Sequence, residues 1–138
     1  MMINIKALLI SICTMIFLGL VFELIFLFID IGYNSLIKNY PLTESIRQPF
    51  YYLLIFSGLF FIMFTGGYLT SIYANKFVMV HTIVSGSVVC GLALYATSSG
   101  YEFTLLSGLF VIIGISFALY GNVVYKNNHH EHQYENSV

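Results

Sequence analysis

The chain has 138 residues, of which 59% are hydrophobic, 17% are aromatic and only 8% are charged, and its formal net charge is −1. So few charged side chains cannot cover the surface of a water-soluble globule of this size, which excludes a cytosolic enzyme fold and a disulfide-stapled secreted module. Five Lys and Arg residues stand against six Asp and Glu residues, so the sequence lacks the basic patches of a nucleic-acid binder and predicts no nucleic-acid partner.

Four uninterrupted apolar stretches follow one another along the chain, and each is about as long as the roughly 20 residues that cross a bilayer's hydrocarbon core. They cover residues 7–29, 50–72, 77–97 and 103–124. A polar segment at 30–49 separates the first two, short turns join the others, and a polar tail covers 125–138. Short turns make the helices that they join antiparallel neighbours. The sequence therefore predicts one integral membrane domain, an all-α up-down bundle of four transmembrane helices surrounded by lipid.

The basic residues near the ends of these spans predict an orientation. With four spans both ends of the chain lie on one side, together with Lys6, Lys76 and Lys126, while Lys38 and Arg47 fall on the other side. The positive-inside rule then places both termini in the cytoplasm. We expect a multi-pass protein of the bacterial inner membrane with residues 30–49 as an outer loop.

Small residues indicate how the helices pack, because lipid gives helices no hydrophobic reason to associate and close backbone approach must hold them together. In the third and fourth spans small residues recur at spacings of three and four, which is typical of crossing helices. These residues are Thr82, Gly86 and Ala93 in the third span and Gly114, Ala118 and Gly121 in the fourth. Gly66 and Gly67 add a close-approach site near the inner end of the second span. We expect the small residues of the third span to face those of the fourth span. The alternative is that small residues occur at these positions by chance.

A short repeat links the second and fourth spans. Ser57-Gly58-Leu59-Phe60 recurs as Ser107-Gly108-Leu109-Phe110. If this repeat reflects duplication, the protein consists of two similar helical hairpins. The alternative is that four letters match by chance in apolar sequence.

One ionisable residue lies deep in the first span. At about 1.5 Å per residue, Glu23 lies about 9 Å inside the outer end of its span, level with Ser57 and Ser107. An ionisable residue at such a depth usually points into the bundle. Glu23 is therefore predicted either to be protonated or hydrogen-bonded between helices, or to serve transport or the binding of a partner.

The histidine of the third span lies closer to the membrane surface. His81 lies about 6 Å from the inner edge, level with Tyr68 and Tyr120, which predicts a cluster of hydroxyl groups near the cytoplasmic face and a structural, hydrogen-bonded imidazole. Roughly 15 Å along the membrane normal separate His81 from Glu23, so the two cannot form an ion pair.

No motif for catalysis is present. The sequence has no Gly-rich phosphate loop and no spacing typical of a serine hydrolase or a metalloprotease. The tail segment His129-His130-Glu131-His132 contains metal-ligating side chain types, but no second group of ligands accompanies it. We predict no catalytic residue, no metal site and no cofactor, and hence a protein that is not an enzyme.

The second and third spans carry one family resemblance. The helix end Gly66-Gly67-Tyr68, the short turn with Lys76 and the early His81 resemble small four-span bacterial membrane proteins in which these features recur. The resemblance implies the four-span fold and no particular activity.

Two functions remain open. The first is a non-enzymatic accessory or interaction protein, such as a subunit of a larger membrane complex or an immunity-type protein that binds a membrane-active toxin; its partner is another membrane protein or a second copy. The second is a minimal oligomeric transporter or channel in which Glu23 is the coupling or selectivity residue.

Overall fold

The computed structural model describes residues 4–74, 76–97 and 105–135, with side chains at 4–74, 76–96 and 107–128. This part of the chain contains four helices that are long and apolar enough to cross a membrane, which confirms the predicted all-α four-helix fold. Its elements are α1 (Ile5–Asn39), the 3-10 helix η1 (Pro41–Ile46), α2 (Arg47–Tyr73), α3 (Val78–Thr97) and α4 (Leu105–Glu135).

The segment 30–49 is helical, whereas the sequence predicted a loop. Helix α1 runs for 35 residues to Asn39, and only Tyr40 separates it from η1. The reason lies in the prolines: Pro41 begins η1 and Pro49 lies in the first turn of α2, where a helix does not need the missing N–H group. The predicted polar tail is also helical as far as Glu135.

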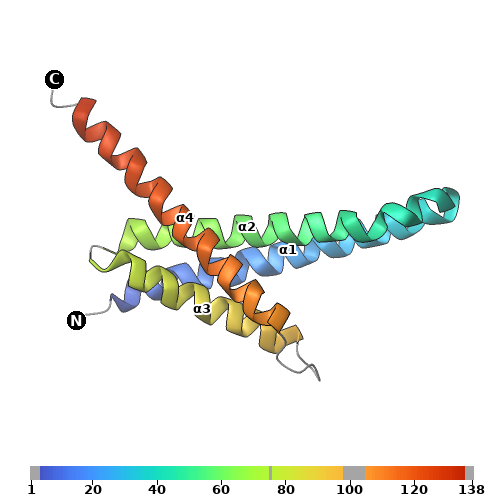
Figure 1. Cartoon of the computed structure of the whole chain (residues 1–138), viewed down its shortest axis with the longest axis horizontal. Coiled ribbons are helices and arrows are strands. Elements are labelled where there is room, and N and C mark those ends of the chain that lie inside the picture. Colours follow the sequence, from blue (N-terminus) through green and yellow to red (C-terminus); the bar gives the residue numbers. More distant parts are fainter. Residues whose placement is uncertain (1–3, 75, 98–104, 136–138) are drawn as a thin grey trace.

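The two hairpins differ in length and cross each other. Helices α1 and α2 form a long hairpin, while α3 and α4 lie only against the part of it near the chain ends, with α4 crossing α2 steeply (Figure 1). The helices have 35 and 27 residues in the first hairpin and 20 and 31 in the second. The start of α1, the end of α2 and the start of α3 meet at one end, as an up-down order requires.

The core contains one buried residue from each helix, namely Met15, Met63, Cys90 and Ala118. Beside it the backbones of α2 and α4 approach most closely. A Cβ on Gly67 would overlap the carbonyl group of Ala118, and a Cβ on Gly121 would overlap that of Phe64. Gly67 and Gly121, which the sequence predicted as packing residues, therefore join α4 to α2. This contact exists in addition to the expected contact between α4 and α3.

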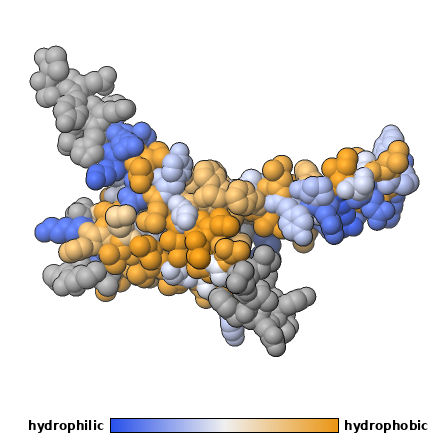
Figure 2. Space-filling model, viewed as in Figure 1, coloured by the Kyte–Doolittle hydropathy of each residue, from blue (hydrophilic) through white to orange (hydrophobic). Residues whose placement is uncertain are grey.

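The outer part of the long hairpin has no core. The buried residues of α1 end at Met15 and those of α2 begin at Gly58, and no residue between them is buried. We call residues 16–57 the arm and the remaining described part the four-helix region. The accessible surface is 9951 Å², against about 7,300 Å² for a compact soluble protein of 15.6 kDa. Much of this surface is apolar, with hydrophilic residues at the tip of the arm and toward the opposite end (Figure 2).

Candidate functional site

Asn4 forms a junction between three helices at the end of the bundle where α1 begins, α2 ends and α3 begins. Its side chain caps α1 by accepting from the N–H of Ala7 at 3.3 Å, and its Nδ2 donates to the carbonyl of Tyr73 at 3.0 Å. Its backbone N–H donates to Nε2 of His81 at 2.8 Å. The other ring nitrogen, Nδ1, lies 2.9 Å from the carbonyl of Phe77 and donates to it. The two bonds fit an imidazole with its proton on Nδ1, so His81 is hydrogen-bonded to backbone groups at the starts of α1 and α3.

A second group of hydrogen bonds lies deeper among the helices. Ser11 Oγ donates to the carbonyl of Gly66 at 2.9 Å, and Thr70 Oγ1 lies 2.8 Å from Ser11 Oγ. On the other side of α2, Ser71 Oγ donates to Asn122 Oδ1 at 2.9 Å, which links α2 to α4. Every buried side-chain nitrogen and oxygen of the described residues has a hydrogen-bond partner. These groups therefore stabilise the bundle and leave no buried polar atom free for a ligand within the described part.

The predicted tyrosines belong to an aromatic ladder and not to a hydroxyl cluster around His81. Tyr68 packs edge-on against Tyr125 with ring centroids 5.2 Å apart, and Tyr120 lies 5.9 Å from Phe64. The ladder continues outward along the crossing of α2 and α4, where Phe60 contacts Phe117 at 5.0 Å. On α2 the members of the ladder recur every four residues, at Phe60, Phe64 and Tyr68. This spacing was the sequence signal that could have revealed the ladder.

The predicted serines lie near the surface of the bundle. Ser57 is exposed and donates to the carbonyl of Leu54 in its own helix at 2.9 Å, and Ser107 is half-buried on α4. The surroundings of the repeated glycines also differ: a Cβ on Gly58 would overlap the ring of Phe22, while one on Gly108 would meet nothing within 4 Å.

The remaining small residues that were predicted to pack between helices lie in different surroundings. Thr82 is buried, and a Cβ on Gly86 would lie 3.3 Å from Met63 and 3.8 Å from Ala118. Gly114 faces Cys90 of α3, and Gly66 lies against the side chain of Met15. Ala93, in contrast, is exposed on α3.

The prediction for Glu23 requires a correction, because this side chain does not point into the bundle. The buried face of α1 is formed by Ala7, Ser11 and Met15, and Glu23 lies off this face on the surface of the arm. It forms no hydrogen bond or ion pair with any described residue. The structure therefore places a carboxyl group on an apolar helix surface without a partner among the residues that it describes.

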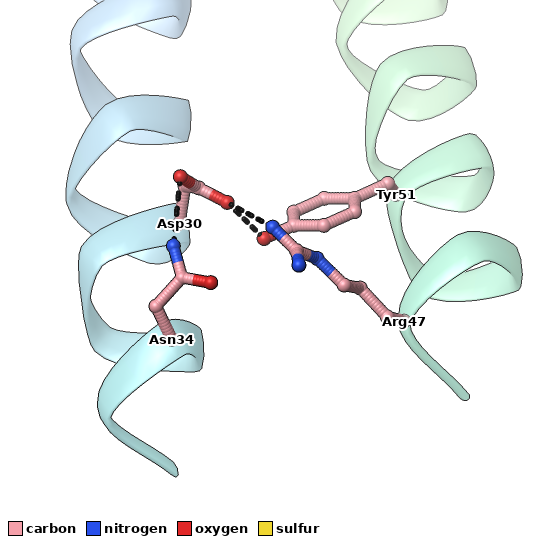
Figure 3. A network of polar contacts seen from close by, with 4 residues as sticks. All are labelled: Asp30, Asn34, Arg47 and Tyr51. Atoms are coloured by element: carbon pink, nitrogen blue, oxygen red, sulfur yellow. Dashed lines mark hydrogen bonds and ion pairs between the residues drawn. The ribbon is translucent and has the colours of Figure 1, made fainter. Parts of the chain in front are cut away.

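The tip of the arm carries a polar network that the sequence did not reveal (Figure 3). Asp30 receives hydrogen bonds from Tyr51 Oη and, at 3.1 Å, from Asn34 Nδ2, and forms an ion pair with Arg47 at 3.3 Å. The guanidinium group also lies over the ring of Tyr51. The hydrogen bond from Tyr51, aided by Arg47, holds the pKa of Asp30 below its usual value, although partial desolvation opposes this. The four-residue spacing of Asp30 and Asn34 was a signal for a continuing helix.

The chain offers no recognised family from which an activity could be transferred. Comparison with protein-family models, curated proteins and solved structures finds no match. Within the described residues no three His, Cys, Asp or Glu side chains come together as metal ligands, and the side chains of His129, His130 and His132 lie outside that part. Helix α1 presents both an exposed apolar surface and the carboxyl group of Glu23.

Proposed function

We propose that this chain is a non-enzymatic accessory protein of a membrane, which binds another membrane protein through the exposed face of α1. The observation that carries the proposal is the exposure of the most apolar helix. In the apolar 18-residue stretch of α1 only 6% of the residues are buried, against 22–28% in the corresponding stretches of the other three spans. Helix α1 is therefore the largest free packing surface among the described spans.

The carboxyl group on this surface favours a protein partner over lipid. A charged side chain inside the hydrocarbon region is costly, by up to about 3 kcal/mol at the centre of a spanning helix on insertion scales. Glu23 meets this cost without a described partner in its own chain. A neighbouring membrane protein that supplies one offsets the cost, and surrounding lipid does not.

The distribution of basic residues supports an orientation for this protein. Lys6, Lys76 and Lys126 lie toward the end where α1 begins, and Lys38 and Arg47 lie at the tip of the arm. By the positive-inside rule, we propose that the chain resides in the bacterial inner membrane with both termini in the cytoplasm. The arm then extends outward, where an immunity-type protein would meet a membrane-active toxin.

Photo-crosslinking of the full chain in its native membrane tests the proposal. A photo-reactive residue replaces Leu20 on α1 or, as the matched control, Leu92 on α3, because both positions are exposed leucines of spanning helices. We expect position 20 to yield one dominant adduct with another membrane protein, identified by mass spectrometry, and position 92 to yield lipid adducts. Lipid adducts alone at position 20 would contradict the proposal.

A flux measurement tests the alternative transporter function. The purified chain is reconstituted into vesicles that contain a pH-sensitive dye, and proton or ion gradients are imposed. We expect no flux above that of empty vesicles. A flux that Glu23→Gln abolishes would replace the accessory function by a minimal transporter that uses Glu23.

A further inference from the structure

The exposed side of α1 carries a regular helix-packing pattern. Six residues at alternating spacings of four and three are all exposed, and we call them the α1 seam: Leu9, Cys13, Ile16, Leu20, Glu23 and Leu27. Side chains with this seven-residue repeat face one side of a helix and pack between the side chains of a second helix that crosses at a small angle. In the described structure no helix occupies this seam.

Glu23 is the one acidic or basic residue of the seam, and it determines what kind of helix fits there. A single polar residue in an otherwise apolar seam fixes the register and the choice of partner. No ion pair of the described residues involves Glu23, and along its own helix the basic residues Lys6 and Lys38 are about 25 Å and about 22 Å away. Arg47 is already paired with Asp30 at the tip of the arm.

A second copy of the chain does not supply the missing cation. Two copies that enter the membrane in the same orientation and pack symmetrically through the seam bring Glu23 opposite Glu23, which supplies a second carboxyl group and no basic side chain at this level. Their lysines lie as far from that level as in one chain. The partner is therefore a different protein.

Resting on the proposed function, we infer that the α1 seam binds a transmembrane helix of another protein that carries a Lys or Arg side chain at the level of Glu23. The two opposite charges compensate each other in the membrane, as intramembrane ionisable residues generally require. Gly19, one turn below Glu23, leaves space for the long stem of the basic side chain, because a Cβ there would meet nothing within 4 Å.

Model helices of defined sequence test this inference without knowledge of the natural partner. Leu-Ala peptides of about 21 residues are made with Lys, Leu or Glu about six residues from the outer end, the depth of Glu23. The full chain, with Cys13 and Cys90 replaced by serine, carries a donor dye at Ser45→Cys in exposed η1 and is reconstituted with acceptor-labelled peptide in phosphatidylcholine vesicles. We expect energy transfer to show about fivefold tighter association with the Lys peptide than with the Leu peptide.

Variants of the chain test whether Glu23 causes the preference for the Lys peptide. Glu23→Gln removes the preference for Lys, and Glu23→Lys reverses it in favour of the Glu peptide. The matched control is Glu44→Gln, the same change at an exposed residue of η1, which keeps the preference for the Lys peptide. Circular dichroism verifies that each variant remains helical.

Equal association with the Lys and Leu peptides would overturn the inference, and so would a preference that survives Glu23→Gln. Energy transfer between two differently labelled copies of the chain that exceeds transfer to any peptide would overturn it in favour of a homodimer. If position 20 crosslinks to a partner while the Lys peptide is not preferred, the proposed function stands and this inference alone fails.

Discussion

The four-helix region and the arm differ in how closely their helices pack. In the four-helix region the backbones of α2 and α4 touch at Gly67 and Gly121, and buried polar groups such as Ser11 and Asn122 are bonded between helices. In the arm two helices contact each other along one side only and bury no residue completely. Its inner side is held by rings, such as Phe26 against Tyr51 with centroids 5.2 Å apart.

This difference separates the residues that determine the fold from those that remain available for recognition. Close packing and satisfied hydrogen bonds in the four-helix region leave little that a partner could use without unfolding the bundle. The arm and the adjoining face of α1 have exposed apolar surface and a carboxyl group that pairs with no described residue. We therefore expect substitutions in the first region to affect stability and substitutions in the second to affect association.

The largest effect is expected where two backbones touch. Gly67→Ala places a Cβ in the position of the Ala118 carbonyl, which the helix backbone cannot vacate by a rotamer change. We expect a loss of about 3 kcal/mol or more in the free energy of unfolding. Unfolding in mixed detergent micelles of rising dodecyl sulfate content, followed by circular dichroism, measures this loss.

Gly91→Ala is the matched control for this substitution. It changes a glycine of α3 around which a Cβ would meet nothing within 4 Å. Its effect stays within about 1 kcal/mol and favours the helix. Equal losses in the two variants would show that the contact between α2 and α4 does not determine stability.

Helix number and type followed from the sequence because length and apolarity alone decide them. The contact between α3 and α4 was expected, but the additional close contact between α2 and α4 did not follow from the sequence. The spacing of Ala118 and Gly121 indicates a packing face on α4, but no periodicity tells whether α2 or α3 occupies it, and the structure shows contacts with both. Asn122, an amide within an apolar span, was a visible signal for an interhelical bond that the sequence interpretation missed.

Helix α1 shows a second limit of sequence interpretation. Almost every residue from 7 to 29 is apolar, so hydrophobic periodicity cannot distinguish the buried face from the exposed one. Glu23 was assigned to the interior on general grounds, and the structure places it outside. The cap in the junction at Asn4 was a visible signal that the sequence interpretation did not use, since an Asn before an apolar run is a typical N-cap.

An intermediate effect is expected at that junction. Asn4→Ala removes the cap of α1 and the bond to Tyr73, so the free energy of unfolding should fall by about 1–2 kcal/mol in the same detergent titration. The matched control is Asn39→Ala at the exposed end of α1, whose side chain reaches only the carbonyl of Ser35 in its own helix. A loss at position 39 as large as at position 4 would contradict a special role for the junction.

A smaller effect of opposite sign is expected within the arm. Gly32 is exposed in α1, and a Cβ there would meet nothing within 4 Å. Gly32→Ala therefore stabilises this helix by about 0.5–1 kcal/mol through reduced freedom of the unfolded chain. Slower hydrogen exchange of the amides around residue 32, with no change at α3, measures the gain. Slower exchange throughout the bundle would show that arm and four-helix region unfold as one unit.

The smallest effect is expected from pH at the tip of the arm. The pKa of Asp30 is lower in the folded arm than its ordinary value of 3.8, so its ionised form stabilises the contact between α1 and α2 above that value. This contribution is lost as the pH falls through the lowered pKa. Asp30 and Arg47 are each 38% exposed, so the change remains local and modest. Neutral and mildly acidic pH should leave the tip unchanged.

Spin labels at Leu36→Cys and Gln48→Cys, with Cys13 and Cys90 replaced by serine, report the distance between the two helices at the tip. We expect the distance distribution to broaden only below pH 3.8 and to be broad at every pH in Asp30→Asn, which keeps the shape of the side chain but not its charge. Glu44→Gln should behave like the parent, because Glu44 takes no part in the network. If Asp30→Asn kept the same acid transition as the parent, the network would not hold the tip, and the aromatic contacts of Tyr33 and Phe50 would remain as its structural basis.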